Sequence, residues 1–245
     1  MTHPVKLRVY PEAEFGGITR YDGTLIYYSR VNALLSSDAI VLDYGCGRGA
    51  HMGGSAPFYK KLCSFKGKVR KVIGVDIGED GESNKSLDEF YHIRDGSIPV
   101  ASESVDLCHS DWVIEHLTDV GKTFGEIRRI LKPGGYFCFR TPNRFHYTSI
   151  GAAIVPFHAH HKLRKLLGHF HGEADVFPTT YPCNTKWKAS RTLREHGFNP
   201  LVFYHRGPSH LMGLGYSAGL LGRWVETMTP RFLCHEIHAF AQKIQ

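Results

Sequence analysis

The stretch "VLDYGCGRG" (41–49) places three glycines at alternate positions directly after a short apolar run. Gly45, Gly47 and Gly49 have no Cβ, so the chain can turn sharply there and a ligand can lie against its backbone. The spacing also satisfies the loose fingerprint of dinucleotide-binding proteins. Asp43 lies two residues before the first glycine, where its carboxylate can face a positively charged amino group of a ligand. The binding of a pyrophosphate does not require a carboxylate at this position. Together these residues predict a turn that binds a nucleoside bearing an amino acid.

Polar groups also follow the next apolar runs. Asp76 ends "VIGVD", where a carboxylate can accept hydrogen bonds from both hydroxyls of a ribose. "RDGSIP" (94–99) and "HSDW" (109–112) add polar side chains on either side of a third apolar run. Ligands of open α/β sheets bind at the carboxyl ends of the strands, so we expect these groups to share one edge.

The elements that must position these groups alternate along the chain. Apolar runs bounded by turn residues predict strands, and a helix is expected before the Pro-Gly-Gly that follows Leu131. A second helix is expected over 184–198, with Asn184 as its cap and Gly197 at its end. The strands are expected at 39–45, 69–78, the first part of 104–117, 136–140, 199–206 and 235–244. The strand within 104–117 is expected to run directly into a helix. This alternation predicts an α/β fold with a parallel sheet and helices on both faces.

We expect one domain, 1–245, with two long insertions. An N-terminal helical cap region is expected at 1–36 and a cofactor-binding core at 37–141. An insertion or lid follows at 142–183. The C-terminal part of the sheet, 184–245, holds a second insertion at 207–232. Connections of this length more often form lids or binding elements than idle loops.

Composition narrows the setting. The net charge of +7 is spread without a dense basic block, so it fits nucleic acid, an anionic membrane surface or an acidic small substrate and selects none of them. The six cysteines form no C-x-x-C pair, which is typical of reduced thiols in a cytosolic protein. The first residues have no apolar core of the signal-peptide type, and no long apolar run follows. We therefore expect a cytoplasmic protein.

Four segments in this order resemble the motifs of the class I S-adenosylmethionine-dependent methyltransferases: "VLDYGCGRG", "VIGVDIG", "DGSIPVASESVDLCHSDWVIEHLTD" and "EIRRILKPGGYFCFRTPN". The resemblance is close over 30–143 and looser over 184–245. It implies a single doubly wound, mostly parallel seven-stranded sheet of the Rossmann-like type, with "HEIHAFAQKI" as a final antiparallel strand. It also implies S-adenosylmethionine as the cofactor.

The resemblance assigns roles to individual residues. The loop from Asp43 to Gly49 would wrap the methionine part, Asp76 would hold the ribose, and Asp95 with Gly96 would lie beside the adenine. Arg30 in "YYSR" is expected either against the methionine carboxylate or as a surface arginine. The full set expected to bind the cofactor is Arg30, Asp43, Gly45, Cys46, Gly47, Gly49, Asp76, Ile77, Asp95, Gly96, Ser110 and Asp111.

The acceptor is less defined. A sulfonium methyl is already electrophilic, so the protein mainly has to orient the acceptor and exclude water. A hydroxyl acceptor needs a base, for which histidine is suited near neutral pH. The candidates are His146 and His158 in the first insertion and His116 after the third strand. The nearer relatives that the sequence resembles are bacterial enzymes associated with glycans, so we predict O-methylation of a small-molecule or glycan-like acceptor.

Other chemistries are disfavoured by the residues present. "HAHH" (158–161) is not completed by a cysteine or carboxylate, so no metal site is predicted. The turn from Ser110 to Val113 lacks the Asn/Asp-Pro-Pro-aromatic pattern of enzymes that methylate base amines, and Cys183 matches C5-methylating enzymes only by its Pro-Cys pair. The absence of a dense basic face disfavours nucleic acid as a partner.

Several alternatives stay open. The chain could act on RNA or protein, or serve as a catalytically inactive nucleoside-binding scaffold; a dinucleotide oxidoreductase is a third alternative, against the four ordered motifs. The apolar insertion 207–232 can form a lid, a dimer interface or a peripheral membrane contact. Its glycines disfavour a helix over 213–222. The sequence specifies neither the acceptor nor the oligomeric state.

Overall fold

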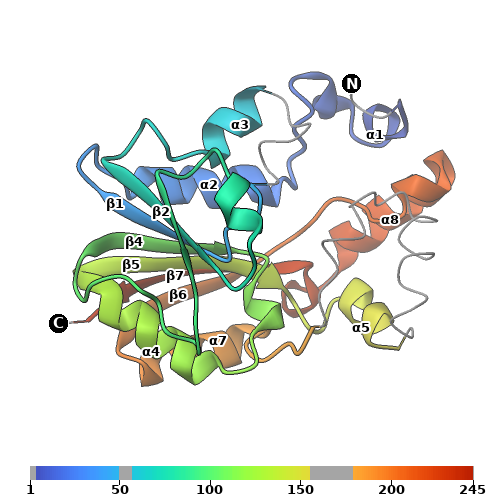
Figure 1. Cartoon of the computed structure of the whole chain (residues 1–245). Helices are drawn as coiled ribbons and strands as arrows, with labels where there is room; N and C mark the ends of the chain where they lie inside the picture. Colours follow the sequence, from blue (N-terminus) through green and yellow to red (C-terminus); the bar gives the residue numbers. More distant parts are fainter. Residues whose placement is uncertain (1–3, 50–56, 155–178, 245) are drawn as a thin grey trace. The chain divides into compact units, whose positions relative to one another are not determined.

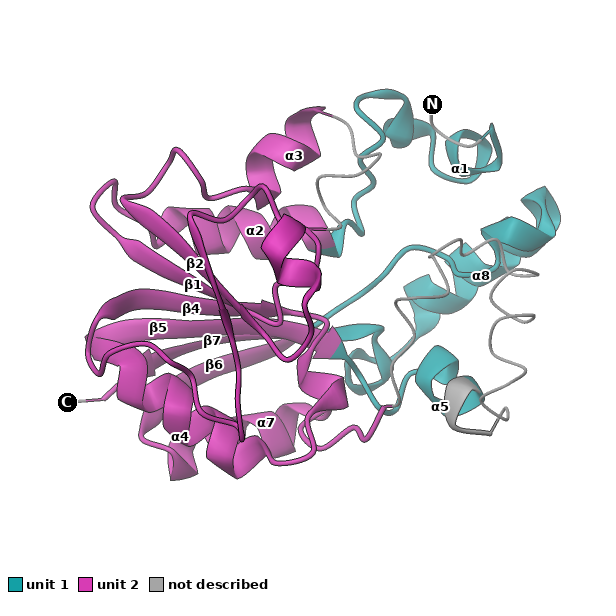
Figure 2. Ribbon diagram, in the orientation of Figure 1, with its two compact units in different colours: residues 1–23, 142–178, 204–236 teal, residues 24–141, 179–203, 237–245 magenta. Residues whose placement is uncertain are grey.

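The computed structural model describes residues 4–49, 57–154 and 179–244, which form two compact units. Unit 1 combines residues 1–23, 142–178 and 204–236, and unit 2 combines residues 24–141, 179–203 and 237–245 (Figure 2). The N-terminal residues, the second insertion and residues 142–178 of the first insertion thus fall together into unit 1. Unit 2 carries the expected cofactor-binding core.

A seven-stranded sheet forms the centre of unit 2 (Figure 1). The strands are β1 Ile40–Tyr44, β2 Lys71–Asp76, β3 Glu89–His92, β4 Val105–Asp111, β5 Leu131–Pro142, β6 Phe198–His205 and β7 Glu236–Lys243. Their order is β3-β2-β1-β4-β5-β7-β6, and the first five strands in this order pair in parallel. The predicted seven-stranded, mostly parallel sheet is therefore confirmed.

Helices cover both faces of this sheet (Figure 1). α2 Gly23–Ala33 and α3 Pro57–Cys63 lie on one face, and α4 Val120–Ile130 and α7 Lys186–Glu195 lie on the other. On the first face Tyr27 and Tyr28 are fully buried in one core cluster with Val41. On the second face the ring of Phe124 packs edge-on against Phe137 at 5.1 Å. The two cores give the doubly wound arrangement.

α4 forms where helical spacing and a capping residue coincide. The Asp119 side chain accepts a hydrogen bond from the Lys122 amide at 2.9 Å and so satisfies one of the free donors of the first turn. Phe124, Ile127 and Ile130 then lie on one face and are completely buried.

The N-terminal cap of α7 lies one residue later than predicted. Thr185, not Asn184, accepts the capping hydrogen bond from the Lys188 amide, at 3.2 Å. The side chain of Asn184 instead donates to Thr141 at 2.6 Å. The predicted end is confirmed, because Gly197 adopts a φ of +73° just after the helix.

The sheet departs from the sequence prediction in three places. β3 was not predicted as a strand; it has only four residues, none fully buried, so its alternation is weak. β5 begins at Leu131, so the Pro-Gly-Gly expected only to stop a helix lies within the strand. After β4 the chain forms the 3₁₀ turn Ile114–His116 instead of running directly into a helix.

Unit 1 is mostly helical. Its elements are α1 Pro4–Val9, the 3₁₀ turns Pro11–Glu14, Met212–Leu214 and Arg231–Leu233, and the helices α5 Tyr147–Ile154 and α8 Tyr216–Met228. The buried Tyr10 hydroxyl accepts from the Ser209 amide at 2.8 Å, and Arg223 on α8 donates to the Val9 carbonyl at 2.6 Å. These contacts join the N-terminal segment to the second insertion.

The glycines that disfavoured a helix over 213–222 have a packing role. A Cβ at Gly222 would lie 2.2 Å from the Ser209 hydroxyl, and one at Gly219 would lie 2.9 Å from a Val9 methyl. α8 therefore needs glycine at both positions to approach these neighbours. Within the described residues, neither α8 nor any other helix has the length and apolar character needed to cross a membrane.

Candidate active site

The glycine loop leaves β1 in a conformation that glycine favours. Gly45, Gly47 and Gly49 have φ angles of +75°, +45° and +75°. A Cβ at Gly45 would lie 2.4 Å from Val113, and one at Gly49 would lie 2.5 Å from the Asn84 side chain. Among the described atoms, nothing lies within 4 Å of a Cβ built on Gly47. The backbone at Gly47 is therefore open to a ligand, as a nucleoside cradle requires.

Asp76 closes the same site from the end of β2. One of its carboxylate oxygens accepts from the Gly47 amide at 2.9 Å, and the other accepts from the Gly78 amide at 3.0 Å. Each carboxylate oxygen can accept a further hydrogen bond, so both remain able to bind ribose hydroxyls. Ile77, the next residue, is 77% exposed and can pack against an adenine ring. The cofactor roles expected for Asp76 and Ile77 stay predictions.

Asn84 supports the loop and was not predicted from the sequence. Its amide group donates to the carbonyls of Cys46 and Gly47, both at 3.1 Å. The Asn84 side chain is almost fully buried, and so is Cys46. Asn84 lies 38 residues beyond Cys46 in a polar segment without a motif, so no local signal in the sequence identifies it.

Asp43 pairs with a histidine of the neighbouring strand. Asp43 on β1 and His109 on β4 are register partners, and the His109 Nε2 lies 3.3 Å from the Asp43 carboxylate. Burial alone would lower the pKa of His109, but the Asp43 carboxylate raises it above its usual value. Asp43 thus already has a partner in the protein, and its contact with the amino end of the cofactor stays a prediction.

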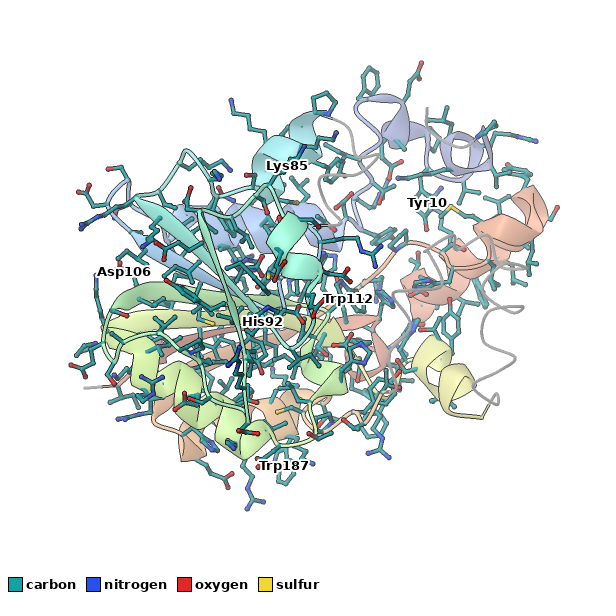
Figure 3. All side chains as sticks on the ribbon, in the orientation of Figure 1. Tyr10, Lys85, His92, Asp106, Trp112 and Trp187 are labelled. Carbon is teal, nitrogen blue, oxygen red and sulfur yellow. The ribbon has the colours of Figure 1, made fainter. Side chains whose placement is uncertain are left out.

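The carboxyl end of β4 holds a buried ion pair. Both carboxylate oxygens of Asp111 accept hydrogen bonds from Arg140, one of them at 2.9 Å, and the Tyr28 hydroxyl donates to the same carboxylate at 2.9 Å. Only 4% of the Arg140 side chain and 7% of the Asp111 side chain are exposed. Trp112, labelled in Figure 3, follows directly with a φ of +59°. The centroid of its ring lies 5.7 Å from the Arg140 guanidinium.

The side chains of Ser110 and Asp111 both have hydrogen-bond partners within the protein. The Ser110 hydroxyl is fully buried and donates to the Tyr44 carbonyl at 3.1 Å. Asp111 is held by Arg140 and Tyr28. Both side chains position the strand ends around the loop, and their direct contact with the cofactor stays a prediction.

Asp95 and Gly96 form an exposed tight turn after β3. Both have positive φ angles, +50° and +70°, and a β-bridge joins Arg94 to Ser97. Asp-Gly is the pair that such a turn favours. The turn presents a polar edge, and its position beside the adenine stays a prediction.

Arg30 packs against an aromatic ring of an edge strand. Its guanidinium is exposed and lies 5.3 Å from the ring centroid of Phe203 on β6, the strand at the far edge of the sheet from β3. This contact favours the alternative, a surface arginine, over a ligand of the methionine carboxylate.

Glu115 is the most perturbed acid at this end of the sheet. Its carboxylate accepts from the Thr141 hydroxyl at 2.9 Å, and Thr141 accepts in turn from Asn184. Burial raises the pKa of Glu115 to about 8. The Nε2 of His116 lies 3.9 Å from the Glu115 carboxylate, and the His116 side chain is 28% exposed. The 3₁₀ turn after β4 therefore combines a largely protonated acid with an accessible imidazole.

We expect Glu115 to make the stability of the protein fall as the pH rises. The folded state keeps the Glu115 proton up to a pKa of about 8, whereas the unfolded chain loses it near 4.5. Between these values the folded state binds more protons, so deprotonation favours unfolding. The free energy of unfolding of wild type, relative to Glu115→Gln, should decline from about pH 5 to about pH 8 and then level off.

Denaturant titrations of both proteins across this pH range measure the difference. Glu195→Gln, at an exposed position on α7, is the matched control and should show no such decline. A difference between wild type and Glu115→Gln that does not change with pH would contradict the raised pKa.

The three candidate bases fall in different places. His116 lies in unit 2 beside Glu115, whereas His146 lies in unit 1, completely buried, with its Nε2 3.2 Å from the Glu226 carboxylate. His158 lies outside the described residues. Cys183 is buried and its pKa is raised by burial to about 11, so the structure disfavours it as a nucleophile.

Comparison with known proteins agrees with this geometry. The methyltransferase-domain family matches residues 24–198. A probable S-adenosylmethionine-dependent methyltransferase of Mycolicibacterium smegmatis is 32% identical over 123 residues, which cover 48% of this chain and 44% of that protein. The malonyl-[acyl-carrier protein] O-methyltransferase of Yersinia pestis is 29% identical over 42% of this chain and 36% of its own length. The chain thus spans less than half the length of these curated relatives.

Solved structures share the fold. The Haloferax volcanii methyltransferase in complex with the Trm112 activator superposes with a TM-score of 0.57 at 15% identity, covering 98% of this chain and 94% of that one. A methyltransferase from Archaeoglobus fulgidus gives a TM-score of 0.55 at 18% identity, covering 95% of this chain and 97% of that one. At these identities the likeness concerns the fold alone.

Proposed function

The chain belongs to the methyltransferase-domain family of class I S-adenosylmethionine-dependent enzymes, and from this premise we propose that it methylates a hydroxyl of a small-molecule or glycan-like acceptor. The observation that carries the cofactor part is the open backbone face at Gly47 beside the Asp76 carboxylate. The acceptor part rests on His116 next to Glu115. Relatives of the chain include O-methyltransferases, which supports oxygen as the target.

We propose that His116 takes the proton of the acceptor hydroxyl. S-adenosylmethionine supplies an electrophilic methyl group, which the acceptor oxygen attacks as the carbon–sulfur bond breaks. A hydroxyl attacks efficiently only when a positioned base removes its proton. His116 follows the carboxyl end of β4, where ligands of such sheets bind, and it is partly exposed. His146 is less suited, because it is completely buried against Glu226.

Residues 207–232 bear on the kind of acceptor. On α8, Leu221, Trp224 and Met228 are 56%, 62% and 65% exposed. Their spacing places them on one face of the helix. This face supports an acceptor with an apolar part, so we include lipid-linked glycans among the candidates, with contact at a membrane surface.

Transfer of labelled methyl groups tests the proposal. Full-length protein is incubated with methyl-labelled S-adenosylmethionine and a panel of sugars, small hydroxylated molecules and lipid-linked glycans. We expect label in a hydroxyl acceptor, and His116→Gln should lower kcat by about 100-fold while the KM for the cofactor changes little. His196→Gln, at the end of α7, is the matched control and should keep wild-type activity.

Other results would redirect the proposal. Label in RNA or protein and in none of the hydroxyl acceptors would contradict O-methylation of small molecules. Cofactor binding without transfer to the panel or to a cell extract would support an inactive nucleoside-binding scaffold. Unchanged kcat in His116→Gln would show that another group is the base.

A further inference from the structure

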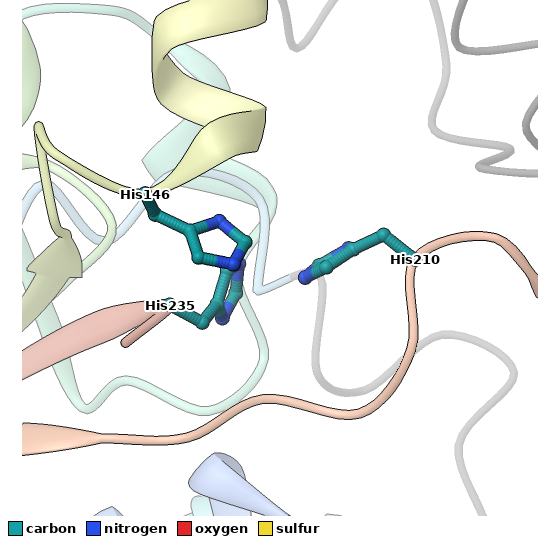
Figure 4. Close-up of side chains that lie close together, drawn as sticks. All are labelled: His146, His210 and His235. Atoms are coloured by element: carbon teal, nitrogen blue, oxygen red, sulfur yellow. The ribbon is translucent and has the colours of Figure 1, made fainter. Parts of the chain in front are cut away.

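Unit 1 brings together three histidines that are far apart in the sequence. His146 precedes α5, His210 lies in the connection after β6, and His235 directly precedes β7. Each histidine has a ring nitrogen that can bind a metal, and these three nitrogens all lie within 4.8 Å of one another. The ring centroids of His210 and His235 are 4.3 Å apart, and those of His146 and His235 are 5.1 Å apart. Figure 4 shows ring nitrogens directed toward the space between the three side chains.

Backbone contacts hold two of these histidines in place. The Asn143 amide donates to the His235 carbonyl at 2.9 Å, and the His146 amide donates to the Asn143 carbonyl at 3.0 Å. The Asn143 side chain also donates to the carbonyls of Phe232 and Cys234, both at 2.8 Å. The turn that carries His146 is thus fastened to the segment that carries His235, independently of the imidazole rings.

A buried carboxylate adjoins this cluster. Glu226 on α8 is completely buried, and one of its oxygens lies 3.2 Å from the His146 Nε2 and accepts from the Tyr147 hydroxyl at 2.8 Å. Among the described residues, its other oxygen has no hydrogen-bond partner. A buried carboxylate is costly without a positive partner. A cation between these side chains would supply the missing charge.

We propose that His146, His210 and His235 bind a divalent transition metal of the zinc class, with Glu226 as the adjoining carboxylate. Imidazole nitrogens favour zinc and its neighbours over calcium or magnesium, which prefer oxygen. A tetrahedral zinc site with bonds of about 2.0 Å separates its ligand atoms by about 3.3 Å. The ligand atoms, which now lie within 4.8 Å of one another, must therefore approach by up to about 1.5 Å, which side-chain rotation can provide.

This site differs from the "HAHH" run considered in the sequence, which lies at 158–161 and outside the described residues. His146 comes from the first insertion, His210 comes from the second, and His235 lies between the second insertion and β7. The three histidines are therefore widely separated in the sequence. The metal would join the segment that begins α5 to the two ends of the 207–232 insertion. We infer a structural role, because the ion would connect segments that are otherwise linked by hydrogen bonds.

Metal binding to the full-length protein tests the inference. The protein is stripped with a chelator, desalted and titrated with zinc by calorimetry, and a parallel sample is loaded with cobalt(II) for absorption spectroscopy. We expect one zinc per chain, a higher midpoint of thermal unfolding with zinc, and the visible bands of tetrahedral cobalt. Wild-type protein that binds no zinc, or whose cobalt spectrum is octahedral, would overturn the proposal.

Variants locate the ion. His210→Ala should abolish the single zinc site, and Glu226→Gln, which leaves all three imidazoles, should weaken it by about 10–100-fold. His92→Gln, on β3 in unit 2, is the matched control and should bind zinc as wild type does. If His210→Ala does not fold, Glu226→Gln and counting of imidazole ligands by X-ray absorption of the zinc-loaded wild type decide the question. Zinc binding that survives these changes but is lost in a His160→Gln, His161→Gln double variant would overturn the assignment.

Discussion

Replacing Asp76 with alanine is expected to weaken S-adenosylmethionine binding by roughly 1,000-fold, or about 4 kcal/mol. The carboxylate lies at the end of β2 and would accept hydrogen bonds from both ribose hydroxyls; hydrogen bonds to a charged group contribute about 1.5–3 kcal/mol each. It also accepts from the Gly47 amide at 2.9 Å, so its loss releases the loop that would hold the methionine part. Calorimetric titration with S-adenosylmethionine and its demethylated product measures the change.

Two further variants separate the causes of that loss. Asp76→Asn keeps one oxygen acceptor and should bind more tightly than the alanine variant but more weakly than wild type. Asp38→Ala removes an exposed carboxylate before β1 and should leave the affinity unchanged. Near-normal binding by a folded Asp76→Ala protein would mean that the cofactor does not use this carboxylate. Failure of folded wild-type protein to bind either ligand would contradict the proposed cofactor altogether.

Replacing Arg140 with methionine is expected to destabilise the protein by about 3–5 kcal/mol. Arg140 and Asp111 are both nearly inaccessible to solvent, so removal of the guanidinium leaves a buried carboxylate without its counter-charge. The hydrogen bond of Arg140 to the Thr24 hydroxyl, at 3.0 Å, is lost as well. For a protein of this size the midpoint of thermal unfolding should fall by roughly 10 °C. Differential scanning calorimetry measures it.

The paired substitution shows whether charge is the cause. Arg140→Met combined with Asp111→Leu removes both charges and should recover part of the lost stability. Arg191→Met breaks an exposed pair between Arg191 and Glu195, whose side chains are 60% and 51% exposed, and should change the stability by less than about 1 kcal/mol. If Arg140→Met were as mild as Arg191→Met, the buried pair would have no special role in stability.

The sequence predicted the parts of the site that depend on local patterns. The glycine loop and Asp76 each occupy a fixed position after an apolar run, so spacing alone places them at one edge of the sheet. The partners of these residues could not be predicted in the same way. His109 meets Asp43 only through strand pairing, and Asn84 reaches Cys46 across 38 residues.

The fold was predictable to a similar extent. The six strands found from apolar runs all form, whereas β3 is too short and too polar to give a clear alternation. Gly219 and Gly222 disfavoured the prediction of a helix at α8. They are required there because α8 packs closely against Val9 and Ser209. Propensity disfavours glycine in an isolated helix, and only the tertiary neighbours show why it is required here.

The division of unit 1 into three separate stretches of chain, 1–23, 142–178 and 204–236, has a consequence for biosynthesis. The first stretch leaves the ribosome well before the helix it packs on, α8, has been translated. Tyr10 and Val9 must therefore wait for Ser209 and Arg223, and the apolar residues around them stay uncovered in the nascent chain. During that interval these apolar residues are open to non-native contacts.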